Sequence, residues 1–116
     1  MASSNDLHPV NSLVNPLLTD MYQISMTYAH WKSNRCEDHS VFDLFFRKPP
    51  FGGSFCIFAG SDEVLKFVSS FRFVDSDIVY LKSILPTCDP NFFVWLQQLD
   101  CSKVKVFTAT EGSVIF

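Results

Sequence analysis

Residues 41–60 read VFDLFFRKPPFGGSFCIFAG, and the fold prediction starts from this stretch. Its first part, 41–48, predicts a strand that is apolar on both faces, because apolar residues occupy both sets of alternate positions. The prolines and glycines of 49–53 are typical of a turn, and the apolar residues 54–59 predict a second strand. A five-residue connection favours a β-hairpin, so we expect these two strands to pair with each other.

Three short helices are predicted after this hairpin, each from signals in its first turn. The first spans about 61–71, and the acidic residues in its first turn suit the positive end of the helix dipole. The second begins at Asp75 and stops before the next proline, and the third begins at Asp89 with Pro90 at the first helical position. The residues that the third helix is expected to turn inward are Phe93, Leu96 and Leu99.

Two further strands are predicted near the end of the sequence. Residues 103–109 (KVKVFTA) alternate between apolar and polar positions, and 113–116 resemble the first residues of another strand. A strand without a partner leaves backbone groups unpaired. We therefore expect this chain to be a fragment of a longer protein.

The N-terminal part combines a predicted tail with the first helix. Residues 1–15 mix polar residues and proline without periodicity and predict a mobile tail, which leaves 16–116 as the domain. Thr19 and Asp20 are typical cap residues, and Gln23 stands three positions after Asp20, as in a capping box.

Two apolar stripes run along this first helix. They contain Met21, Ile24, Tyr28 and Trp31 in one case, and Tyr22, Met26 and Ala29 in the other. A helix that covers a single surface needs only one such stripe. We therefore expect the helix to be sandwiched, with a partner chain as one candidate for its second neighbour.

Composition excludes several classes of protein. Of 116 residues 47% are apolar and 18% are charged, which argues against general disorder, and a net charge of −3 gives no basic footprint for nucleic acid. The longest stretch without a charged residue or histidine, 49–61, is too short to cross a membrane. The sequence shows no secretory signal, and its four cysteines form no C-x-x-C pair, so we expect reduced thiols and a cytosolic location.

No complete catalytic or metal-binding motif is present. Cys36 and His39 form a C-x-x-H pair, but a zinc site needs about four ligands and no second pair exists, so chance spacing explains it and no metal site is predicted. Gly52 and Gly53 would let the backbone approach a ligand closely, although a plain turn explains them equally well.

Arg47 and Tyr22 are the two strongest candidates for chemistry. Arg47 ends an otherwise apolar strand, where its guanidinium suits a phosphate or a carboxylate, but a charge that protects a sheet edge is an equal alternative. Tyr22 lies in the first turn of the helix, where its ring could stack on a ligand. Packing in the core is the alternative for this ring.

Five segments resemble the nicotinate phosphoribosyltransferase family. The most specific feature is PLLTDxYQ followed by FFRKxPFGG, which lie in NPLLTDMYQISMTYAHW (15–31) and VFDLFFRKPPFGGSFCIFAG (41–60). The similarity continues in FRFVDSDIVYLKSILP (71–86), FFVWLQQLDCSKVKV (92–106) and EGSVIF (111–116), so that it covers nearly all of the chain outside the tail.

This resemblance implies an α+β N-terminal domain, with a small, mostly antiparallel sheet and about four helices, packed against an α/β barrel that lies outside this chain. It also implies a dimeric enzyme that makes nicotinate mononucleotide and pyrophosphate from nicotinate and phosphoribosyl pyrophosphate, with coupled hydrolysis of ATP and with Mg²⁺. The family couples ATP through a phosphohistidine, but no histidine of this sequence matches its position. We expect the fragment alone to bind no cofactor and to be inactive.

The resemblance assigns roles to two residues. Tyr22 matches a tyrosine that stacks on the pyridine ring across the dimer interface, and Arg47 resembles a catalytic arginine that the partner subunit directs toward the pyrophosphate. Thr19 and Asp20 are interpreted as caps that aim Tyr22. Asp43 shares a strand face with Arg47 and is interpreted as orienting it.

One alternative from a different class remains open. A short product that keeps only the first helix and its apolar stripes would be a catalytically inactive dimerisation module. The choice of nicotinate over nicotinamide depends on residues of the barrel.

Overall fold

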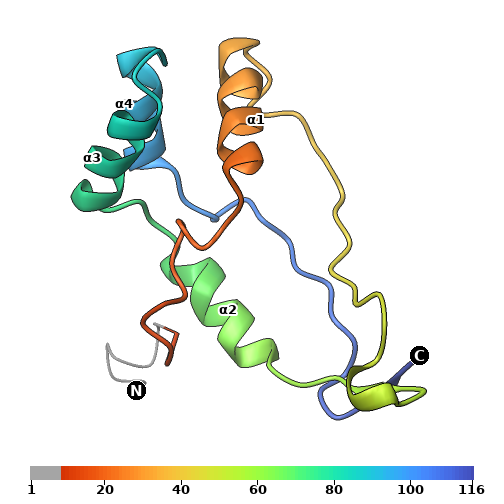
Figure 1. Cartoon of the computed structure of the whole chain (residues 1–116). Coiled ribbons are helices and arrows are strands. Elements are labelled where there is room, and N and C mark those ends of the chain that lie inside the picture. Colours follow the sequence, from red (N-terminus) through yellow and green to blue (C-terminus); the bar gives the residue numbers. More distant parts are fainter. Residues whose placement is uncertain (1–8) are drawn as a thin grey trace, which may run out of the picture.

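The computed structural model describes residues 9–116, which form four α-helices and a small antiparallel sheet (Figure 1). The predicted α+β class is confirmed. Residues 1–8 of the predicted tail lie outside the described residues, so the boundary at residue 15 stays a prediction. The elements in chain order are α1 Met21–Lys32, the 3₁₀ turn η2 Pro50–Gly52, β1 Cys56–Ile57, α2 Ser61–Ser70, α3 Asp75–Ile84, α4 Pro90–Gln98 and β2 Val114–Ile115.

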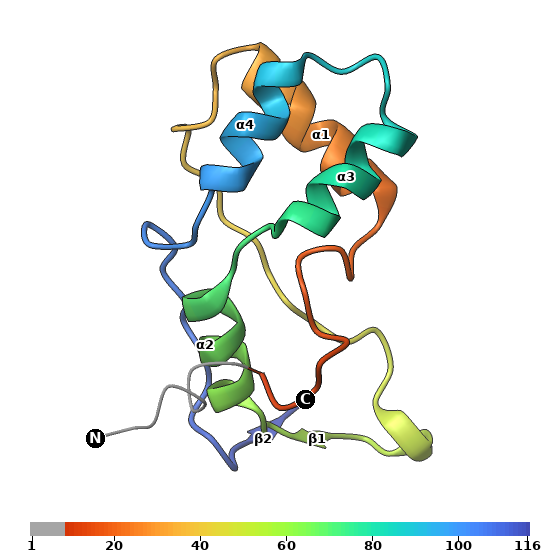
Figure 2. The same ribbon diagram turned by 90° about the vertical axis from the view of Figure 1, so that its left-hand side faces the viewer.

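Helices α1, α3 and α4 pack together at one end of the molecule, which we call the helical end (Figures 1 and 2). Phe92 of α4 is fully buried at its centre. The ring of Tyr28 meets Phe92 edge-on at 5.0 Å between centroids, and the ring of Trp31 lies at 5.7 Å. The other buried residues of this core are Ile24, Phe73, Ile78, Leu81, Phe93 and Leu96.

The three predicted short helices all form with boundaries close to those expected. Helix α4 begins at Pro90, and the Asp89 side chain caps it by accepting the backbone N–H of Asn91 at 2.9 Å. Helix α3 begins at Asp75, where the backbone N–H of Val74 donates to the Asp77 carboxylate at 3.0 Å. These contacts lie within a few residues of the helix starts, which is why the helix starts could be predicted.

The predicted hairpin between 41–48 and 54–59 is wrong. Strand β1 pairs instead with β2, with Cys56 opposite Ile115 and Ile57 opposite Val114 in an antiparallel register. Residues 41–48 are extended but form no strand in the described part of the chain. Two features of the connecting turn explain why the hairpin does not form. Prolines at 49 and 50 have no backbone N–H to donate to a strand ladder. The turn η2 also coils the connection, with Phe51 at a φ of 57°.

The two C-terminal strand predictions have different outcomes. Residues 113–116 do contain a strand, β2, and its pairing is extended by a bond of 2.8 Å from the Phe58 N–H to the Ser113 carbonyl. Residues 103–109 are extended and run past α2, but they pair with no strand among residues 9–116. No helix in that range is long and apolar enough to cross a membrane.

Candidate functional site

Tyr22 lies in the first turn of α1, with 59% of its surface exposed. The helix begins at Met21 with Asp20 as its cap residue, as predicted. The Asp20 backbone N–H donates to the side-chain oxygen of Gln23 at 2.9 Å, and the Thr19 hydroxyl contacts the same oxygen. Two positions after Tyr22, Ile24 is only 7% exposed and anchors the opposite side of the helix in the core.

The two stripes of α1 differ in what covers them. Ile24, Tyr28 and Trp31 pack in the helical end, although Met21 at the start of their stripe is half exposed. The second stripe, Tyr22, Met26 and Ala29, is exposed, and no other element of residues 9–116 covers it. We call it the exposed stripe. Whether a partner chain covers it stays a prediction.

Arg47 and Asp43 lie in the extended segment 41–48, and both are exposed. Within the described part of the chain, Arg47 takes part in no ion pair, and Asp43 does not bind it. The apolar neighbours are exposed as well, including Val41 at 95% and Leu44 at 96%. The guanidinium of Arg47 is therefore available to an acceptor outside this copy of the domain.

One copy of the domain does not bring the two candidate residues together. Helix α1, which carries Tyr22, and the turn η2, which follows Arg47 closely, lie at opposite ends of the molecule in both views (Figures 1 and 2). The longest dimension of the molecule is 46 Å. A site that contains both residues of the same copy would need the segment 41–48 to take a different path.

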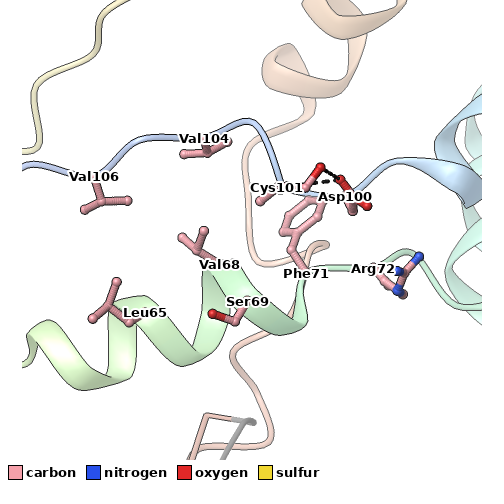
Figure 3. A pocket seen from close by; sticks show the side chains of 10 residues that line it. Leu65, Val68, Ser69, Phe71, Arg72, Asp100, Cys101, Val104 and Val106 are labelled. Atoms are coloured by element: carbon pink, nitrogen blue, oxygen red, sulfur yellow. Dashed lines mark hydrogen bonds between the residues drawn. The ribbon is translucent and has the colours of Figure 1, made fainter.

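A cavity lies elsewhere, between α2 and the extended chain that follows α4 (Figure 3). It has a volume of about 370 Å³, and Leu65 and Val68 of α2 face Val104 and Val106 across it. Its polar end carries Asp100, whose carboxylate accepts both the backbone N–H and the hydroxyl of Ser102. Neither Tyr22 nor Arg47 lines this cavity.

Among residues 9–116, the metal-binding and nucleophilic groups give no second candidate. No three His, Cys, Asp or Glu side chains of residues 9–116 come together as a metal site. All four cysteines are free in the structure. Burial raises the pKa of the Cys36 and Cys101 thiols, and nearby acidic side chains raise it further. A reactive cysteine needs a lowered pKa, so neither thiol has the environment of a nucleophile.

Glu111 is a structural residue that the sequence analysis missed. Its carboxylate accepts the Gly60 N–H at 2.8 Å, the Ser61 N–H at 3.3 Å and the Ser61 hydroxyl at 2.6 Å. The Ser61 hydroxyl and these backbone donors lower the pKa of Glu111. Glu111 thus caps α2 from fifty residues away and joins it to β2. The available signal was a helix preceded by Gly60, which has no side chain to cap it.

Comparisons with known proteins identify relatives over almost the whole chain. The sequence profile of the nicotinate phosphoribosyltransferase (NAPRTase) N-terminal domain matches residues 17–116. A nicotinate phosphoribosyltransferase of Dictyostelium discoideum is 47% identical over 98% of the chain, and nicotinate phosphoribosyltransferase 1 of Arabidopsis thaliana is 47% identical over 93%. The human nicotinate phosphoribosyltransferase is 43% identical over the full chain.

The chain spans only about a fifth of these relatives: 19% of the Dictyostelium and Arabidopsis proteins and 22% of the human one. No solved structure gives a significant match.

Proposed function

This chain belongs to the family of nicotinate phosphoribosyltransferase N-terminal domains, and we propose that it acts as part of an enzyme that makes nicotinate mononucleotide. In the proposed reaction, the ring nitrogen of nicotinate bonds to the ribose carbon of phosphoribosyl pyrophosphate, and pyrophosphate leaves. The observation that carries this proposal is the family match over residues 17–116, together with identities of 43–47% to proteins of that name. This chain spans 19% of the Dictyostelium relative, and we propose that most of the catalytic part corresponds to the remainder of such a protein.

Tyr22 is the residue proposed to stack on the pyridine ring. Its ring is 59% exposed on a helix that the core holds through Ile24, so a planar ligand can reach one face of it. A tyrosine used for core packing would be covered like Tyr28, which contacts Phe92. Stacking of two aromatic rings contributes about 0.5–1.5 kcal/mol beyond the buried area.

Arg47 is proposed as the catalytic residue that binds the pyrophosphate. Its guanidinium is exposed and Lys48 follows it directly, so this turn presents two positive charges. The fork of N–H donors on arginine binds phosphate oxygens in pairs. A cation placed at a departing pyrophosphate stabilises the charge that develops in the transition state.

We propose that the site is shared between two copies of the chain in a homodimer. Two features support this arrangement: the exposed stripe of α1, and the uncovered apolar residues of 41–46. A partner that covers both surfaces would also give the segment 41–48 its final path. This change in the path of the segment 41–48 would bring Arg47 toward the site that Tyr22 reaches.

The remaining parts of the proposal concern ATP, Mg²⁺ and location. We propose that ATP hydrolysis is coupled to the reaction and that the groups that hold ATP and Mg²⁺ lie in the catalytic part beyond this chain. We propose that the enzyme is cytosolic and has no nucleic-acid or membrane partner. The lack of a basic cluster and the free cysteines support it.

The test is an assay of the full-length protein with nicotinate or nicotinamide, phosphoribosyl pyrophosphate and Mg²⁺, each with and without ATP. We expect nicotinate mononucleotide to form, faster with ATP, and no product from the 116-residue chain alone. Turnover of nicotinamide only would overturn the substrate assignment. A full-length protein that dimerises but turns over neither base would favour the inactive dimerisation module.

A further inference from the structure

We infer that Gln23 is a positioning residue that holds the first turn of α1, and with it the ring of Tyr22, in place for the ligand. This inference rests on the proposed role of Tyr22. Gln23 itself touches no ligand in this arrangement. It acts through the backbone that carries its neighbour.

Gln23 is tied to Asp20 by two bonds in opposite directions. Its side-chain oxygen accepts the Asp20 N–H at 2.9 Å, and its own backbone N–H donates to the Asp20 carbonyl at 3.1 Å. The Thr19 hydroxyl contacts the same side-chain oxygen. These contacts close a short loop of chain, and Tyr22 is one of the two residues inside it.

Tyr22 depends on this loop because it has few other restraints. The first backbone N–H groups of a helix have no acceptor within the helix, so the first turn frays readily. The ring of Tyr22 is mostly exposed, whereas the first buried side chain of the helix, Ile24, comes two positions later. The contacts made by Gln23 therefore restrain the part of α1 that the core does not reach.

Helix α3 offers a matched control with the same arrangement. Its cap residue, Val74, donates its N–H to the side chain of Asp77 at 3.0 Å, and the Asp77 N–H donates to the Val74 carbonyl at 3.0 Å. Asp77→Ala removes from α3 the same kind of contact that Gln23→Ala removes from α1. Helix α3 carries neither Tyr22 nor Arg47.

The experiment compares Gln23→Ala, Gln23→Glu, Asp77→Ala and Tyr22→Ala in the full-length protein. We expect Gln23→Ala to raise the KM for nicotinate about twofold to fivefold and by no more than Tyr22→Ala does, because Gln23 acts only through that ring, with kcat within about twofold. Glutamate also accepts the Asp20 N–H, so Gln23→Glu should restore the KM. Asp77→Ala should destabilise the protein to a similar degree and leave the KM unchanged.

Amide hydrogen exchange of the 116-residue chain supplies a readout that needs no activity. Gln23→Ala should speed exchange at residues 20–24, and Asp77→Ala should speed it only at the start of α3. The inference is overturned if Gln23→Ala leaves that exchange unchanged. It is also overturned if Tyr22→Ala raises the KM and Gln23→Ala does not. If Tyr22→Ala itself leaves the KM unchanged, the proposed stacking role of Tyr22 has failed, and the role of Gln23 fails with it.

Discussion

The helical end and the segment 41–60 are both rich in phenylalanine, yet they use it differently. Phe92 is fully buried and has the rings of Tyr28, Trp31, Phe93 and Trp95 around it. Phe42, in contrast, is 88% exposed in a segment that has no strand partner among residues 9–116. The same residue type stabilises the fold in one region and is available to other molecules in the other. Buried and exposed phenylalanines are thus separated along the chain.

The largest effect is expected at Phe92. Phe92→Ala removes the central ring of a core and should lower the free energy of unfolding by about 3–5 kcal/mol. Phe42→Ala is the control from the exposed region and should change it by less than about 0.5 kcal/mol. Urea unfolding followed by tryptophan fluorescence measures both, and Phe92→Leu provides a milder variant. Equal losses for Phe92→Ala and Phe42→Ala would break the comparison.

The next effect concerns Arg47 in the full-length protein. Arg47→Ala should lower kcat/KM for phosphoribosyl pyrophosphate by about ten- to a hundredfold, because a charged hydrogen bond is worth about 1.5–3 kcal/mol. Arg47→Lys should restore activity only in part, since an ammonium group cannot form the paired contacts. The free energy of unfolding should not change, because Arg47 is exposed.

Mixed dimers test whether the site is shared. A subunit with Arg47→Ala is combined with a subunit that is inactivated in the catalytic part. If Arg47 acts in the partner's site, one of the two sites regains a complete set of residues and activity returns. A confirmed mixed dimer without activity would place Arg47 in its own subunit's site or outside it.

A smaller effect is expected at Tyr22. Tyr22→Ala should raise the KM for nicotinate about twofold to tenfold, the loss expected for one aromatic stack. Tyr22→Phe keeps the ring and should stay close to the wild-type KM. A large drop in thermal stability with an unchanged KM would assign Tyr22 to packing and would break the contrast between the two stripes of α1.

The smallest and most local effect is expected at Glu111. Glu111→Gln should speed amide exchange at Gly60, Ser61 and Phe58, on the order of fivefold, because it weakens the cap of α2. Glu37→Ala, which removes an exposed contact with Lys103, is the control and should leave those amides unchanged. Unchanged exchange in Glu111→Gln would show that the pairing of β1 with β2 protects these amides without the carboxylate.

The contact between Glu111 and the start of α2 should also respond to acid. Hydrogen bonds lower the pKa of Glu111 in the folded chain below its ordinary value of 4.5. The stabilisation is therefore present above the unfolded pKa and is lost as the pH falls through the folded one. Exchange at Gly60 should rise, relative to the intrinsic rate, as the pH drops below about 4.5, and Glu111→Gln should remove this dependence.

The starts of α3 and α4 could be predicted from the sequence because their determinants are local. Asp89 caps α4 from the adjacent position, and Asp77 binds the N–H of Val74 three residues away. The sheet could not be predicted in this way. Spacing favoured a hairpin, whereas the partner of β1 lies almost sixty residues further on, just after the turn from which Glu111 binds Ser61. Sequence distance carries no information on such a pairing.

The candidate site also has one part that local sequence predicts and one part that it does not. The start of α1 and the double stripe that includes Tyr22 follow from periodicity, and the structure confirms both the helix and its buried face. The position of Arg47 does not follow, because 41–48 has no partner within the described residues that would direct its path.

The exposed segment 41–46 also has a consequence for the synthesis of the protein. Five of its six residues are apolar, it contains no proline, and Asp43 is its only charge. Short segments of this kind are the sequence signature of cross-β aggregation, and a single charge in their middle acts against stacking. Until something covers the segment, a nascent chain presents it to its neighbours on the same polysome. We therefore expect chaperones to bind this segment. We also expect Asp43→Asn to form fibrils faster.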